Sequence, residues 1–134
     1  MGENRKFGHV VRELEVEFQG EVRKVTHYHF VAWPDHGVPQ ELQSLDKFVE
    51  DLQSEEERAK PIVVHCSAGV GRTGTLIALS QLKHIIYSQK AARVDLGVSV
   101  FSVVRRLREQ RVLMVQSKEQ YEILFELVDL WIRR

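Results

Sequence analysis

The interpretation of this chain begins with one stretch of its sequence, Pro61-Ile62-Val63-Val64-His65-Cys66-Ser67-Ala68-Gly69-Val70-Gly71-Arg72-Thr73. Residues 61–64 are apolar and predict a short strand that is buried on both faces. A helical pattern of apolar residues follows over residues 75–86. In a tight loop between a strand and a helix, backbone N–H groups point inward and the helix dipole adds positive potential. The stretch therefore predicts a loop that binds a phosphate group.

Cys66 is the candidate nucleophile of this loop. A cysteine thiolate is the reactive form, and a helix N-terminus with a nearby cation lowers the thiol pKa to about 3.5–7.5. Arg72 supplies the cation and a fork for two phosphate oxygens, and the Thr73 hydroxyl is within plausible reach of the sulfur. An isolated cysteine is more often an inert core residue. Two glycines and an arginine in the next six positions argue against that interpretation here.

Length and composition indicate a single domain over residues 1–134. The chain has 134 residues, a formal net charge of zero and 43% hydrophobic residues, which is typical of a soluble globular protein. This balance gives no electrostatic reason to expect nucleic acid or an acidic membrane as a partner. No apolar stretch reaches transmembrane length and no signal peptide opens the chain. A single cysteine excludes an internal disulfide, and a reactive thiol indicates the cytosolic side.

The first third of the chain predicts a hairpin and a loop. Apolar and acidic residues alternate over residues 13–18, Gln19-Gly20 is a turn signal, and residues 22–31 are rich in β-branched and aromatic types. Two prolines and a glycine within residues 33–39 exclude regular structure there. With the run at 61–64, the predicted total is three strands and four helices, and therefore a thin sheet.

Apolar spacing predicts the four helices and their buried faces. The first buries Leu45, Phe48, Val49 and Leu52. The second covers residues 75–86, and residues 89–97 form a connector. Ser99 caps the third helix, which buries Val100, Val103, Val104 and Leu107. Ser117 and Gln120 form a capping-box pattern at the last helix, which is expected to bury Tyr121, Leu124, Phe125, Val128 and Ile132.

Attack of a thiolate on a phosphate ester requires a general acid and later a positioned water molecule. Asp35 is the candidate acid because it lies in a loop bounded by proline and glycine that could swing over the site. An aspartate in such a sequence often only stabilises its own turn. Trp33 and Pro39 favour a different interpretation, in which they anchor the two ends of a mobile flap. Gln116 and Gln120 are candidates for positioning the water, although capping and solvation are their ordinary roles.

Other phosphate chemistry fits the sequence poorly. The nucleotide-binding pattern with two glycines, a lysine and a serine or threonine fails, because Gly69 and Gly71 have the wrong spacing and no such lysine follows. The sequence contains no acidic cluster with metal-ligand spacing. No metal or cofactor is expected.

Three segments resemble the motifs of cysteine-dependent protein tyrosine phosphatases, in the right order. Residues 65–74 are similar to the family signature, residues 33–39 to its mobile acid loop and residues 114–121 to its glutamine loop. They resemble the phosphotyrosine-specific branch more than the dual-specificity branch. The resemblance covers the chain from about Val10 to its end. It implies an α/β fold with a mixed sheet flanked by helices, apparently truncated at the N-terminal side.

The resemblance also implies residue roles and a substrate class, phosphotyrosine in proteins. Cys66 is implied as nucleophile, Arg72 as phosphate clamp, Asp35 as acid and then base, and Thr73 as support for the thiolate. Gln116 is implied to orient water with help from Gln120, and His65 to hold the loop and tune the cysteine. The residues implied to bind substrate are Ser67, Ala68, Gly69, Val70, Gly71, Arg72, Asp35, Gln116 and Gln120.

Two departures from the family leave alternatives open. Domains of this branch are longer, and no counterpart of their N-terminal phosphotyrosine-recognition part is found before Val10. Leu113 occupies a place where many relatives have glycine, beside the pocket mouth, where a bulkier residue would narrow the substrate range. A dual-specificity enzyme, a phosphate-binding module with negligible catalysis and an inactive fragment are the alternatives to a tyrosine phosphatase.

Overall fold

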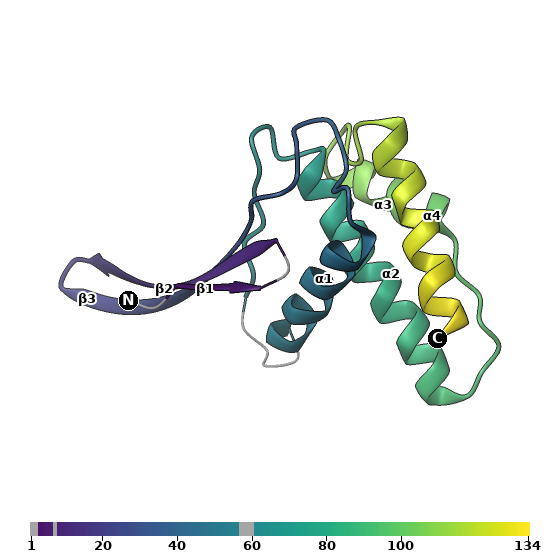
Figure 1. Ribbon diagram of the computed structural model, residues 1–134, viewed down its shortest axis with the longest axis horizontal. Helices are drawn as coiled ribbons and strands as arrows, with labels where there is room; N and C mark the ends of the chain where they lie inside the picture. Colours follow the sequence, from purple (N-terminus) through teal and green to yellow (C-terminus); the bar gives the residue numbers. More distant parts are fainter. Residues whose placement is uncertain (1–2, 7, 57–60) are drawn as a thin grey trace.

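A three-stranded sheet precedes four helices in the computed structural model, which describes residues 3–6, 8–56 and 61–134 (Figure 1). The strands are β1 (Glu3–Lys6), β2 (His9–Phe18) and β3 (Glu21–Phe30). The helices are α1 (Leu42–Glu56), α2 (Arg72–Ala92), α3 (Val100–Gln110) and α4 (Lys118–Arg133). The outer part of the β2–β3 hairpin extends away from the helices (Figure 1). The α/β class is confirmed, and the described sheet is antiparallel throughout.

The predicted hairpin is confirmed. β2 pairs with β3 from His9 opposite Phe30 to Phe18 opposite Glu21, without a bulge. The turn residues Gln19 and Gly20 both have positive φ, 50° and 80°, as a two-residue hairpin turn of the favoured twist requires. The third strand is β1 on the outer side of β2, and the sequence pattern did not predict it.

The core lies mainly among the helices. α2 packs against α1, α3 and α4, and its buried residues include Leu79, Leu82 and Ile86. Every predicted apolar residue of α1 and α3 is buried. In α4 the prediction was wrong for Phe125 and Ile132, which are exposed. Ile123, Leu127 and Trp131 are buried there instead.

Local capping explains where the helices start and stop. Ser99 accepts a hydrogen bond from the N–H of Ser102, and Ser117 and Gln120 form the predicted capping box. α2 begins at Arg72 rather than Thr75 and runs to Ala92, into the predicted connector. Arg93 ends it in the left-handed conformation, with a φ of 55°.

The predicted buried strand at residues 61–64 was wrong. This segment belongs to no strand in the described part of the chain, and Val63 is 89% exposed. A strand that is apolar on both faces needs a paired neighbour at each edge. The described sheet contains only β1, β2 and β3, so residues 61–64 receive no such neighbour from it.

A buried polar cluster joins α1, α2 and α4. The Asp46 carboxylate accepts hydrogen bonds from Lys83 at 3.2 Å and from the Trp131 indole at 2.7 Å, and it pairs with Arg134 at 2.9 Å. Burial alone would raise the pKa of Asp46. The hydrogen bonds from Trp131, Lys83 and Arg134 outweigh burial and hold this pKa below its ordinary value.

We predict that Asp46→Ala lowers the free energy of unfolding by about 3–5 kcal/mol, because it leaves the Lys83 ammonium buried without its partner. Urea denaturation followed by circular dichroism measures the change. Asp129→Ala is the matched control, since it breaks only an exposed pair with Arg133, and it should cost less than about 1 kcal/mol.

This stabilisation should depend on pH. A carboxyl with a lowered native pKa contributes fully above its unfolded pKa of about 3.9 and loses its contribution as the pH falls through the native value. The difference between the native chain and Asp46→Ala should therefore shrink on acidification. An equal loss in the two aspartate variants at neutral pH would contradict the role given to Asp46.

Candidate active site

The loop from Cys66 to Gly71 curls around the cysteine sulfur. The Gly69 N–H donates to Cys66 Sγ at 3.2 Å. Gly69 has a φ of 75°, in the region that favours glycine. Cys66 is partly buried, whereas the side chains of Ser67 and Ala68 are exposed. Val70 is directed into the core, so it can offer a ligand only its backbone N–H.

Hydrogen bonds to the sulfur favour the thiolate. Burial acts to raise the pKa of the Cys66 thiol, but hydrogen bonds from the Thr73 hydroxyl and from the backbone N–H groups of Thr73, Gly69 and Val70 lower it below the ordinary value. The Thr73 hydroxyl is buried and has no well-aligned partner in the described part of the chain, so its bond to the sulfur is a loose one. From the sequence, this effect was expected from the helix N-terminus and the Arg72 cation, with the Thr73 hydroxyl within reach of the sulfur.

Arg72 instead reaches across to the acid loop. As the first residue of α2, it donates to the backbone oxygen of Trp33 at 3.1 Å and lies 3.6 Å from Asp35 Oδ1. Its Nε is buried without a partner among the described residues. A guanidinium with a buried donor that has no partner, beside N–H groups that point to a sulfur, is suited to donate a hydrogen bond to a phosphate oxygen.

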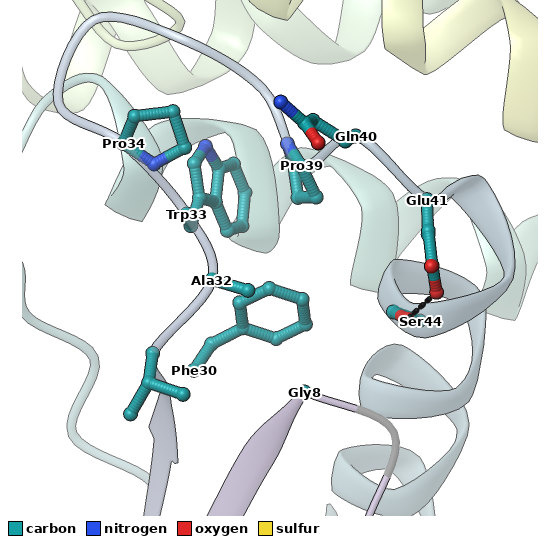
Figure 2. A pocket seen from close by; sticks show the side chains of 10 residues that line it. Gly8, Phe30, Ala32, Trp33, Pro34, Pro39, Gln40, Glu41 and Ser44 are labelled. Carbon is teal, nitrogen blue, oxygen red and sulfur yellow. Dashed lines mark hydrogen bonds between the residues drawn. The ribbon is translucent and has the colours of Figure 1, made fainter.

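The acid loop, residues 33–39, is held by its own contacts. The buried Trp33 donates from its indole to the Gly37 oxygen at 2.9 Å, and the Gly37 N–H donates to the Pro34 oxygen at 3.2 Å. Figure 2 shows the Trp33 ring between Pro34 and Pro39, beside a cavity of about 640 Å³ lined by both ends of the loop. Asp35 itself is 60% exposed and accepts from the His36 N–H.

The two glutamines have different positions. Gln120 is fully buried, and its Oε1 accepts from the N–H groups of Gln116 and Ser117. Its Nε2 donates to the Gly37 oxygen of the acid loop at 3.3 Å. Gln116 is exposed, and its Oε1 lies 2.9 Å from where a Cβ on Gly71 would stand. Gln116 therefore lies against the loop of residues 66–71, and Gln120 is hydrogen-bonded to the acid loop.

Two arginines that sequence reasoning missed support the loops. Arg111 donates to the Ala68 oxygen at 3.1 Å, and its guanidinium lies over Gly69. Arg108 donates to the oxygens of Met114 and Val115, at 2.9 and 2.8 Å. These contacts link the end of α3 to the loops on either side. Exposed arginines near a helix end are common, so only the tertiary contacts distinguish this pair.

The glutamine segment is tightly constrained. The Val115 N–H donates to the Val70 oxygen at 2.9 Å, and both Leu113 and Val115 have positive φ, 64° and 63°. A Cβ on Gly74 would stand 2.6 Å from the Val115 nitrogen, so α2 can approach this segment only with glycine there. Leu113 is 60% exposed.

His65 is the predicted site residue that the structure does not bring into this network. Its ring is exposed and makes no hydrogen bond or ion pair within the described part of the chain. The pKa of His27 in β3 is lowered mainly by burial and then by the charges of His29 and Arg12. The charge of His65 acts in the same direction but contributes least. The other predicted residues lie in three segments: the acid loop, residues 66–73 at the start of α2, and residues 116–120 at the start of α4.

The comparisons with known proteins assign the chain that carries these segments to one family. The family model described as protein-tyrosine phosphatase matches residues 2–129, so the chain belongs to this family. The chain is also 36% identical over 123 residues to the human "Tyrosine-protein phosphatase non-receptor type 12". That match covers 91% of this chain and 15% of the relative, so the chain spans a small part of the length of this relative.

The described residues provide neither a metal-binding cluster nor a membrane-spanning helix. They contain no group of three or more histidine, cysteine, aspartate or glutamate side chains placed to hold a metal ion. Among the same residues, no helix combines the length and the apolar character needed to cross a membrane.

We predict that Thr73→Ala raises the pKa of Cys66, because it removes the hydroxyl that stabilises the thiolate. The rate of Cys66 alkylation by iodoacetamide, measured as a function of pH, should then reach its midpoint at a higher pH than in the native chain. Thr73→Ser keeps the hydroxyl and should retain the native midpoint. The same midpoint in all three proteins would show that Thr73 does not act on the sulfur.

Proposed function

We propose that this chain hydrolyses phosphotyrosine in proteins through a phosphoryl-cysteine intermediate. The observation that carries the proposal is the position of Arg72, which contacts both Trp33 and Asp35 of the acid loop while it starts the helix behind the Cys66 loop. The nucleophile loop and the candidate acid are therefore joined through one guanidinium. Membership of the protein-tyrosine phosphatase family supports the same reaction.

The first step transfers the phosphoryl group to sulfur. The Cys66 thiolate attacks phosphorus, the S–P bond forms, and the bond from phosphorus to the tyrosine oxygen breaks. Protonated Asp35 gives its proton to that departing oxygen, so tyrosine leaves neutral and Asp35 becomes a carboxylate. Arg72 and the backbone N–H groups of residues 67–71 bind the phosphoryl oxygens. These donors stabilise the negative charge on the oxygens in the transition state.

The second step releases phosphate. Water attacks the phosphorus and gives its proton to the Asp35 carboxylate, while the S–P bond breaks and returns the thiolate. Gln116, which lies against the Gly71 side of the loop, orients that water in this proposal. The hydrogen bonds that lower the Cys66 pKa make the sulfur a better leaving group, because they stabilise the same anion.

The reactive thiolate also indicates where the protein acts. A cysteine whose pKa is lowered and which is partly exposed is readily oxidised. Cys66 is the only cysteine of the sequence, so no second thiol in this chain can rescue it as a disulfide. A reducing compartment, such as the cytoplasm, suits this chemistry.

We predict that Cys66→Ser abolishes hydrolysis of a phosphotyrosine peptide, and that Asp35→Asn lowers kcat by about 10²- to 10³-fold. The Asp35→Asn loss should be smaller for p-nitrophenyl phosphate, because nitrophenolate leaves without a proton. Asp129→Asn, on the exposed face of α4, is the matched control and should keep native kinetics. Undiminished turnover by Cys66→Ser would contradict the mechanism.

Binding measurements separate this proposal from its alternatives. Asp35→Asn should bind the phosphotyrosine peptide with nearly native affinity, measured by calorimetry, because the acid acts only on the leaving oxygen. Comparable turnover of phosphoserine peptides would indicate a dual-specificity enzyme. Peptide binding without any turnover by the native chain would instead indicate a phosphate-binding module.

A further inference from the structure

One peptide unit of the Cys66 loop connects the sulfur to an arginine of another segment. The Gly69 N–H donates to Cys66 Sγ at 3.2 Å. The Ala68 oxygen accepts from the Arg111 guanidinium at 3.1 Å. This oxygen and that N–H belong to the same peptide, which is trans and planar, so they point in opposite directions. The guanidinium therefore stands at one end of the peptide dipole and the sulfur at the other.

The backbone at Gly69 does not by itself fix the orientation of this peptide. Gly69 has a φ of 75°, and turning the peptide over would bring φ into the negative region, which glycine adopts about as readily. The Ala68 oxygen, rather than the Gly69 N–H, would then face the sulfur and would repel a thiolate. A contact from outside the loop can therefore select the observed orientation.

Arg111 supplies such a contact from the end of α3. Its guanidinium atoms lie 3.3–3.4 Å from where a Cβ on Gly69 would stand, so they pack over the peptide as well as bonding to its oxygen. The Arg111 N–H donates to the oxygen of Leu107 at 2.9 Å, and Leu107 is buried in the core. The exposed side chain of Arg111 therefore reaches the loop from a well-packed helix end.

The segment after α3 also holds a second carbonyl of the loop. The Val115 N–H donates to the Val70 oxygen at 2.9 Å. Together with the bond from Arg111 to Ala68, this contact engages the carbonyl before Gly69 and the carbonyl after it. The segment therefore fixes the loop at two points, and its arginine acts on the peptide that meets the sulfur.

The orientation of this peptide affects the charge on Cys66. Burial raises the pKa of Cys66, hydrogen bonds from Thr73 lower it, and the N–H of Gly69 lowers it further. A charged donor at the Ala68 oxygen polarises the peptide and strengthens the bond that its N–H makes to the sulfur. Loss of Arg111 would therefore weaken one of the hydrogen bonds that stabilise the thiolate.

We propose that Arg111 is a positioning residue, which holds the peptide between Ala68 and Gly69 with its N–H directed at the Cys66 sulfur. Arg111 acts through the peptide and not on the reacting atoms. This role does not rest on the proposed hydrolysis of phosphotyrosine, because it concerns the ionisation of one thiol in the free protein. A failure of the hydrolysis proposal would leave it standing.

The pH dependence of Cys66 alkylation by iodoacetamide tests this role without any substrate. Arg111→Met removes the charge and the donors, and it should raise the midpoint by roughly 0.5–1 pH unit. Arg105→Met is the matched control, because it removes the same charge from α3 at an exposed pair with Glu109, and it should keep the native midpoint. Other charged or titratable groups of the surrounding segments stay unchanged in both variants: Arg72, Arg108, Asp35 and His65.

Two further measurements separate the peptide contact from a remote effect of charge. Raising the salt from about 0.05 to 0.5 M screens a remote charge, so the difference between the native chain and Arg111→Met should persist. In NMR spectra, the Gly69 amide proton should move downfield as Cys66 ionises, and it should move much less in Arg111→Met.

Circular dichroism and thermal unfolding establish that each variant is folded. If Arg111→Met does not fold, Arg111→Lys replaces it, since an ammonium keeps the charge but lacks the planar fork over Gly69, and a smaller rise in the midpoint is expected. Four results would overturn the proposal: a native midpoint in the Arg111 variant, an equal rise in Arg105→Met, a difference that disappears in salt, or a Gly69 amide that titrates as in the native chain.

Discussion

The start of α2 is the point on which the candidate site depends. Within three consecutive residues, the Val70 oxygen accepts from the Val115 N–H, Gly71 leaves room for Gln116 and Gln120, and Arg72 reaches Trp33 and Asp35. Two segments far apart in the sequence, the acid loop and residues 115–120, are therefore tied to one helix end. Because a helix N-terminus presents free N–H groups, the same point that joins the segments also favours an anion.

The features with local causes were predictable from the sequence. A two-residue turn with Gln19 and Gly20, the cap at Ser99 and the capping box at Ser117 each depend on side chains and backbone within a few residues. The loop around Cys66 was also predictable, because small residues, a cysteine and an arginine before a helix have a chemical meaning together. Residues 61–64 failed as a strand because a buried strand depends on distant partners, which local apolar character cannot supply.

The supporting contacts of the site could not be predicted for the same reason. Arg111 holds Ala68 across 43 residues, and Gln120 holds Gly37 across 83 residues. Spacing alone predicted that the helix N-terminus and the Arg72 cation would act on the sulfur. In the structure, hydrogen bonds from Thr73, Gly69 and Val70 lower the Cys66 pKa, and Arg72 contacts the acid loop. The hydrogen-bond partner of a long side chain depends on the folded structure and cannot be predicted from the spacing of residues in the sequence.

The proposed mechanism depends on one covalent bond, between Cys66 and phosphorus. Rapid-quench mass spectrometry on Gln116→Ala, turning over a phosphotyrosine peptide, measures whether that bond forms. Under the proposed mechanism, loss of the amide that orients water slows hydrolysis of the intermediate and lets it accumulate. The mechanism predicts one phosphoryl group per chain, located on Cys66 by peptide mapping. Continued release of phosphate with no phosphorylated chain, or with the phosphoryl group on another residue, would contradict it.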